Sequence, residues 1–135
     1  MLECLILGDS IAVGMSQFKP ECRLIAKGGI NTWQFNRQYK VDLSSEIAII
    51  SLGSNDHSGI NTRKELEDLR SRIVKTTLVY WILPAIKPHI QLTVKNIAQE
   101  HGDIVISIPR LQKDGIHPSW AGYKEMASMI NSTRK

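Results

Sequence analysis

Hydrophobic residues occur along this chain in short, nearly unbroken runs, which alternate with longer stretches where they recur every three or four positions. The run Ile47-Ala48-Ile49-Ile50 shows the first pattern. Because successive side chains of a strand point to opposite faces, a strand that is apolar throughout must be covered on both faces, as in a parallel sheet. Runs of this kind predict strands at residues 2–7, 23–26, 46–52, 78–83 and 103–108.

The intervening stretches have the spacing of amphipathic helices. In one of them Ile90, Val94 and Ile97 form a single apolar stripe. In the last one Pro118 is expected at the first helical position, where its missing N–H costs nothing. The pattern predicts helices at residues 31–38, 62–76, 87–101 and 118–132.

Strands that alternate with helices through short connections favour right-handed crossovers and an α/β fold. We therefore expect a three-layer α/β/α sandwich with a parallel sheet of about five strands. No repeat, linker or low-complexity segment interrupts the 135 residues, and this length is typical of one domain. Residues 1–135 are accordingly expected to form a single domain.

Charge and hydropathy exclude several classes of partner. The 17 basic and 13 acidic residues leave a net charge of +4, and the basic residues are scattered apart from Arg134-Lys135, so we expect no nucleic-acid partner. The longest uncharged apolar runs are far shorter than the roughly 20 residues of a membrane helix. The first residues also lack the basic segment and cleavage site of a signal peptide. We expect no membrane partner and, by default, a cytoplasmic protein.

The two cysteines and the glycine-rich segments point to no bound cofactor. Cys4 and Cys22 lie in apolar runs, where a free thiol behaves as a small hydrophobe, so buried thiols are favoured over a disulfide. No group of His, Cys, Asp and Glu has the spacing of metal ligands. The glycines lack the remaining residues of a phosphate loop or a dinucleotide-binding fingerprint. We expect neither a metal nor a cofactor.

Polar segments follow four of the five predicted strands. Ligands of an open parallel sheet bind outside the carboxyl ends of the strands, so these segments would share one rim. The segments are Gly8-Asp9-Ser10, Gly28-Gly29-Ile30-Asn31-Thr32, Gly53-Ser54-Asn55-Asp56 and Asp114-Gly115-Ile116-His117.

Three residues of these segments have the chemistry of a nucleophilic triad. A serine hydroxyl needs a neighbouring base, and the base needs a third group that fixes its tautomer and stabilises the imidazolium. Asp114 lies three residues before His117 in a turn that contains glycine, so the carboxylate can reach the imidazole. Ser10 would meet the other imidazole nitrogen from across the rim. The sequence thus predicts Ser10, His117 and Asp114 as nucleophile, base and orienting acid.

Acyl transfer also requires donors aimed at the developing oxyanion. The candidates are the N–H groups of Ser10 and Gly29 and the side-chain amide of Asn55, and a glycine at position 29 lets the backbone approach a substrate closely. Asp56 is expected to orient its loop rather than to react. Asp9 and Gly53 are assigned supporting positions in the same segments.

With these residues in place, the sequence resembles the SGNH hydrolases, also called the GDSL esterase/lipase superfamily. The resemblance extends from Gly8 to Tyr123, and all four segments occur in family order. By this resemblance the nucleophile is Ser10, the glycine and asparagine donors are Gly29 and Asn55, and the Asp-x-x-His pair is Asp114 and His117.

Two positions depart from the commonest family pattern. Ile30-Asn31 stands where many members have an acidic residue followed by threonine or serine, so Gly28 stays open as the donor in place of Gly29. Ile11 stands where the family's popular name expects leucine, and that position is apolar in either case.

The resemblance implies a flavodoxin-like fold and a cofactor-free serine esterase that acts on small acyl esters through an acyl-enzyme. Similar small members often remove acetyl groups from carbohydrates, so O-acetylated carbohydrate is the first expected substrate. The chain has no long hydrophobic insertion to shield a long acyl chain. The alternatives are a lysophospholipase or thioesterase, and a non-catalytic carbohydrate-binding module on the same fold.

The remaining aromatic and histidine residues are expected to be structural. Trp81 lies inside an apolar run and is predicted in the core. Trp33 and Trp120 are favoured as core or helix-surface residues over a sugar- or acyl-binding face. The other histidines are expected to be solvated or to cap helices, with His57 bordering the substrate as the alternative for that residue; they are His57, His89 and His101.

Overall fold

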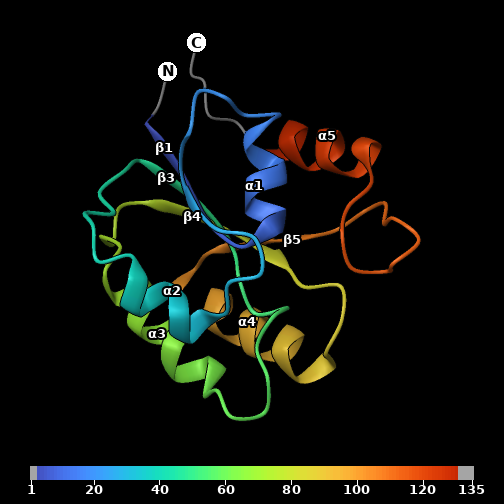
Figure 1. Cartoon of the computed structure of the whole chain (residues 1–135). Helices are drawn as coiled ribbons and strands as arrows, with labels where there is room; N and C mark the ends of the chain where they lie inside the picture. The colour runs from blue at the N-terminus through green and yellow to red at the C-terminus, as the bar shows by residue number, and fades with distance from the viewer. Residues whose placement is uncertain (1–2, 131–135) are drawn as a thin grey trace.

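The computed structural model describes residues 3–130. It contains a five-stranded parallel sheet in the order β2-β1-β3-β4-β5, which confirms the predicted fold class (Figure 1). The strands are β1 (Cys4–Gly8), β2 (Arg23–Ala26), β3 (Ile47–Ser51), β4 (Leu78–Leu83) and β5 (Ile104–Ser107). The helices are α1 (Ser10–Ser16), α2 (Thr32–Gln38), α3 (Thr62–Ser71), α4 (Pro88–His101) and α5 (Trp120–Met129).

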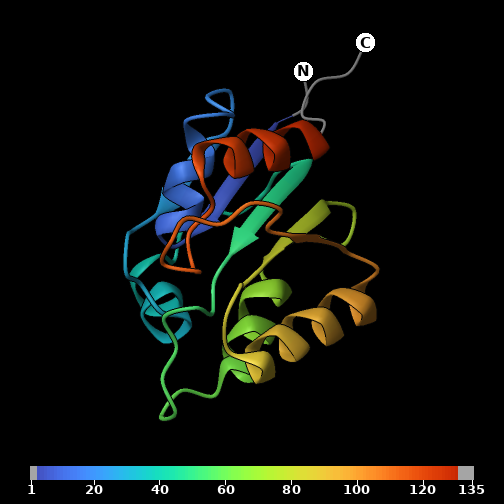
Figure 2. The same cartoon turned by 90° about the vertical axis from the view of Figure 1, so that its right-hand side faces the viewer.

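Helices cover both faces of the sheet, which makes the fold a three-layer sandwich. Helices α1 and α5 lie together on one face, and α2, α3 and α4 lie on the other (Figures 1 and 2). Every residue of β1 and β3 is buried, as the continuous apolar runs predicted.

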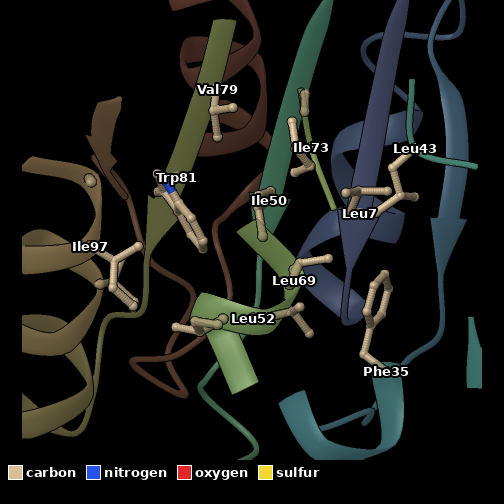
Figure 3. Packing of buried hydrophobic residues seen from close by; sticks show 14 of the residues in the cluster. Leu7, Phe35, Leu43, Ile50, Leu52, Leu69, Ile73, Val79, Trp81 and Ile97 are labelled. Atoms are coloured by element: carbon tan, nitrogen blue, oxygen red, sulfur yellow. The ribbon is translucent and has the colours of Figure 1, made fainter. Parts of the chain in front are cut away.

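Alternate residues of the central strands enter two separate cores. Leu7 and Ile50 point to the side of α2, α3 and α4, whereas Ile6 and Ile49 point to the side of α1 and α5. Trp81 is buried in the first core, as predicted, with Val79, Leu69 and Phe35 among its members (Figure 3). Burial of this kind contributes roughly 25 cal/mol for each Å² of apolar surface removed from water, so both layers of helices hold the sheet.

Three helices differ from their sequence prediction. Helix α1 was not among the expected helices, because its seven residues are too few to show a periodic stripe. Helix α3 ends at Ser71 rather than at residue 76, because β-branched residues with lower helix propensity follow Ser71.

None of the helices between residues 3 and 130 is long and apolar enough to cross a membrane.

The start of α5 also corrects the sequence prediction. Pro118 lies before the helix rather than at its first position, because Ser119 is the N-cap and its hydroxyl accepts a hydrogen bond from the Gly122 N–H at 3.1 Å. The helix ends at Met129, and the predicted continuation beyond residue 130 lies outside the described residues.

The two cysteines form a disulfide, so the expectation of free thiols was wrong. Leu5 of β1 pairs with Arg23 of β2, and the preceding residues, Cys4 and Cys22, therefore lie side by side with their Cα atoms 4.7 Å apart. This register could not be read from the sequence. Disulfides persist chiefly in oxidising environments, so the bond weighs against the default expectation of a cytoplasmic protein.

The strand order reverses direction between β1 and β3. The chain leaves β1 towards β2 at one edge and leaves β3 towards β4 in the opposite direction. In open α/β sheets such a reversal leaves the space between two neighbouring connections free for a ligand. Ser10 follows β1 and Asn55 follows β3 at this point.

Candidate active site

Ser10, His117 and Asp114 form a continuous hydrogen-bonded chain at the rim. Ser10 is the first residue of α1, and its Oγ lies 2.9 Å from Nε2 of His117. Nδ1 of the same imidazole lies 2.7 Å from Oδ2 of Asp114. The structure therefore brings together the three residues that the sequence placed in separate segments.

Asp114 is exposed but is held by its own turn. Its Oδ1 accepts hydrogen bonds from the N–H groups of Ile116 at 2.9 Å and His117 at 3.0 Å. These bonds, that of His117 first, lower the pKa of the Asp114 carboxyl to about 2. An ionised carboxylate only accepts hydrogen bonds, so in the neutral imidazole the proton is on Nδ1 and Nε2 is the acceptor for the Ser10 hydroxyl.

Asp9 joins the nucleophile helix to β3 and the loop after it. Its buried carboxylate caps α1 by accepting from the Ile11 N–H at 3.0 Å. It also accepts from the hydroxyls of Ser51 at 3.0 Å and Ser54 at 3.2 Å. Burial raises the pKa of Asp9, and these hydrogen bonds offset part of that rise. The arrangement fixes the direction in which α1, and hence Ser10, leaves the sheet.

Asn55 and Asp56 lie in the loop after β3 and have different roles. The Nδ2 group of Asn55 donates to the Ile30 carbonyl at 3.0 Å, and its second N–H has no acceptor among the described residues. Asp56 is buried and accepts from the Thr32 N–H at 2.9 Å and from the hydroxyls of Thr32 and Thr62, each at 2.6 Å. Asp56 therefore ties the loop to the starts of α2 and α3.

Gly28 and Gly29 occupy a tight turn opposite Ser10. The Ile30 N–H donates to the Lys27 carbonyl at 3.2 Å, and Gly29 has φ +79°, a conformation that glycine adopts without strain. A side chain at Gly28 would lie 3.9 Å from Cβ of Ser10, so the peptide linking the two glycines borders the nucleophile. Within residues 3–130 the N–H groups of Ser10 and Gly29 have no hydrogen-bond acceptor, which leaves both free for a substrate oxygen.

Comparison with known proteins supports this geometry at the level of the fold. No protein-family model matches the chain, and no curated protein matches it. Two solved structures share the fold, each with a TM-score of 0.65 over 93% of this chain. One is a candidate acylhydrolase from Bacteroides fragilis NCTC 9343, with 20% identity over 83% of that chain. The other is a member of the lipolytic protein G-D-S-L family from Veillonella parvula DSM 2008, with 16% identity over 94% of its length.

This chain has the SGNH/GDSL hydrolase fold. Gly53 lies where the loop after β3 packs closely against α4. It has φ +118°, and a side chain there would come within 2.7 Å of Ile90 on α4, so only glycine lets the loop after β3 approach that helix.

One residue that contacts this loop was not predicted from the sequence. Lys87, just before α4, donates from Nζ to the carbonyls of Ser54 at 2.9 Å and Asp56 at 2.6 Å. A single lysine followed by proline has no pattern that indicates a function. The feature that distinguishes Lys87 is its left-handed backbone, which is seen only in the structure.

One cavity near the loop after β3 is lined in part by an aromatic side chain. A cavity of about 310 Å³ adjoins the Asn55 loop and is lined by Asn31, Trp33, Gln34, His57, Gly59 and Ile60. Trp33 is 50% exposed with the Arg37 guanidinium over its ring at 4.4 Å, and Trp120 is 70% exposed against Phe18. The sequence favoured either the core or a helix surface for these two tryptophans. Both lie on helix surfaces, and neither is in the core.

His57 is exposed, as expected for a solvated residue, and it also borders this cavity. Its Nδ1 accepts from the Gly59 N–H at 3.1 Å, which leaves Nε2 as the protonated nitrogen of the neutral ring. The other two histidines, His89 and His101, are exposed on α4.

One group of potential metal ligands occurs among the described residues. Cys4, Glu21 and Cys22 bring their ligand atoms within 4.8 Å of one another. Both thiols are consumed by the disulfide, so the group does not offer the thiolates that metal binding requires.

Proposed function

We propose that this protein is a serine esterase that hydrolyses small acyl esters through an acyl-enzyme. The observation that carries the proposal is the hydrogen-bonded chain from Ser10 through His117 to Asp114. A serine at a helix start beside an acceptor imidazole, with a carboxylate on the opposite ring nitrogen, is the arrangement that activates a hydroxyl for attack. The names of the two structural neighbours agree with ester chemistry.

In the first half-reaction Ser10 Oγ attacks the ester carbonyl carbon while Nε2 of His117 takes its proton. The carbonyl electron pair moves to oxygen, and the proposed donors to this oxyanion are the N–H groups of Ser10 and Gly29 and the free amide hydrogen of Asn55. The imidazolium is stabilised by ionised Asp114, whose pKa of about 2 keeps it charged. His117 then gives its proton to the leaving alcohol as the ester C–O bond breaks.

Deacylation repeats these steps with water. His117 takes a proton from a water molecule that attacks the acyl-enzyme carbonyl, and the same donors hold the second oxyanion. Collapse of this intermediate breaks the bond to Ser10 Oγ, which regains the proton from His117. The acid is released, and no metal or cofactor takes part in any step.

The first proposed substrate class is O-acetylated carbohydrate. The cavity lined by Trp33 and His57 combines hydrogen-bonding side chains with the half-exposed ring of Trp33. Such a lining suits a hydroxyl-bearing ring better than a long acyl chain, which needs an apolar slot. The lysophospholipase and thioesterase alternatives require that slot, and a carbohydrate-binding module would use the same cavity without turnover.

A substrate panel tests this proposal. Hydrolysis of p-nitrophenyl acetate, butyrate, octanoate and palmitate is compared with release of acetate from acetylated sugars, using Ser10→Ala as the inactive control. We expect turnover of acetylated sugars and of the shortest esters, lost in the variant. A preference for palmitate would replace the carbohydrate assignment by a lipase-type one. Sugar binding without turnover in the folded wild type would establish the binding module instead.

A further inference from the structure

Lys87 has an unusual backbone for a residue with a side chain. It is the only non-glycine residue with positive φ among residues 3–130, at φ 63° and ψ 83°. Pro88 follows it and disfavours the right-handed helical conformation at Lys87. Left-handed backbone at such a residue is strained and persists only where the surroundings hold it, and strain of this kind gathers at functional sites.

The lysine side chain provides the hold. Its ammonium donates to the Ser54 carbonyl at 2.9 Å and to the Asp56 carbonyl at 2.6 Å. These two carbonyls flank Asn55 in the chain. One cation therefore clamps the backbone on both sides of the residue that donates to the oxyanion.

The clamp acts on a side chain with few other constraints. Asn55 is exposed, and within residues 3–130 its side chain has one hydrogen bond, to the Ile30 carbonyl at 3.0 Å. Lys87 has no carboxylate within ion-pair distance in the described part of the chain, so its ammonium is committed to the two loop carbonyls. Ser54 extends the connection, since its hydroxyl donates to Asp9, the cap of the nucleophile helix.

We propose that Lys87 is a positioning residue that fixes the amide of Asn55 at the oxyanion. The inference rests on the proposed esterase function. A donor displaced by about 1 Å loses much of its effect on a transition state, so the consequence of losing the clamp belongs to kcat rather than to KM.

The test compares four variants on p-nitrophenyl acetate. Lys87→Met keeps the apolar stem and removes the ammonium, and Lys87→Gly removes the ammonium while suiting the left-handed backbone. Lys87→Arg restores a cation, and Lys95→Met on the exposed side of α4 is the matched control. We expect kcat to fall about 10- to 100-fold in the first two variants with KM little changed, Lys87→Arg to recover part of the loss, and the control to match wild type.

A purely structural lysine would give a different result. Lys87→Gly would then melt at a changed temperature while the folded enzyme kept its kcat, and this outcome would overturn the proposal. Lys87→Gly also keeps the test valid if Lys87→Met does not fold.

A double-mutant cycle with Asn55→Ala tests the route of the effect. Because Lys87 acts through Asn55, Lys87→Gly should lower kcat by less than about twofold once Asn55 is alanine. Equal losses in both backgrounds would contradict the proposal. Failure of the esterase function itself is distinguished by the wild type, which would then show no turnover that depends on Ser10.

Discussion

The two halves of the proposed site are built in different ways. In the part of the chain that the structure describes, Asp114, on the acid–base side, accepts three hydrogen bonds, all from donors within three residues along the chain. Asp56, on the oxyanion side, also accepts three there, but from Thr32 and Thr62, which belong to the starts of α2 and α3. Asp114 is exposed and Asp56 is 3% exposed.

This difference separates chemistry from support. A local, exposed turn can present His117 with little contribution to the fold, because the hydrogen bonds to Asp114 all come from within the turn. A buried carboxylate that joins three segments holds both the fold and the oxyanion loop. Substitutions on the first side should therefore change turnover alone, whereas those on the second should change stability as well.

The largest expected effect is that of His117→Ala. Without the base, Ser10 keeps its proton, so kcat should fall by about 10⁴-fold or more while the melting temperature stays within experimental error of wild type. Steady-state kinetics and thermal melting followed by circular dichroism check both parts. A variant that retained a tenth of the activity would remove His117 from the mechanism.

Asp114→Asn should have the next largest effect, about 10²- to 10⁴-fold on kcat. Since the pKa of Asp114 is about 2, wild-type Asp114 stays charged in any ordinary assay, so this variant removes a full negative charge from beside the imidazole. Steady-state kinetics measure the loss, and a variant with wild-type kcat would contradict this arrangement.

Asp56→Ala tests the supporting side. It leaves the donors of Thr32 and Thr62 buried without an acceptor, and the free energy of unfolding should fall by about 3 kcal/mol. Urea denaturation measures this value, with Asp114→Ala as the matched exposed carboxylate, for which we expect almost no change. Similar losses in the two variants would erase the distinction between the two sides.

Asp9→Asn should give the smallest effect, visible mainly as a change with pH. Burial raises the pKa of Asp9 above 3.8, so the folded protein binds this proton more tightly than the unfolded chain and loses stability as pH rises through the raised value. Asparagine also caps helices but does not titrate. The unfolding free energy of the variant relative to wild type should therefore grow between about pH 4 and about pH 7. A difference that shrinks over this range would contradict the raised pKa.

The sequence predicted those parts of the fold that depend on local patterns. The buried runs of β1, β3 and β4 were found because a strand covered on both faces needs continuous apolar residues. The grouping of Ser10 with His117 followed from the rule that segments after parallel strands meet at one edge.

Features that depend on register or backbone conformation were not predictable in this way. The Cys4–Cys22 disulfide follows from the pairing of β1 with β2, which no local pattern specifies. The clamp of Lys87 on the loop after β3 depends on a left-handed backbone more than thirty residues away along the chain. The short α1 was missed because two helical turns are too few to show periodicity.

The central claim is that Ser10 is an activated nucleophile. It is tested most directly by intact-mass analysis after treatment with a fluorophosphonate probe, with Ser10→Ala treated in parallel. The account predicts one adduct on the wild type and none on the variant, with turnover of p-nitrophenyl acetate lost in step. A folded wild-type protein that takes up no probe and shows no turnover would contradict it.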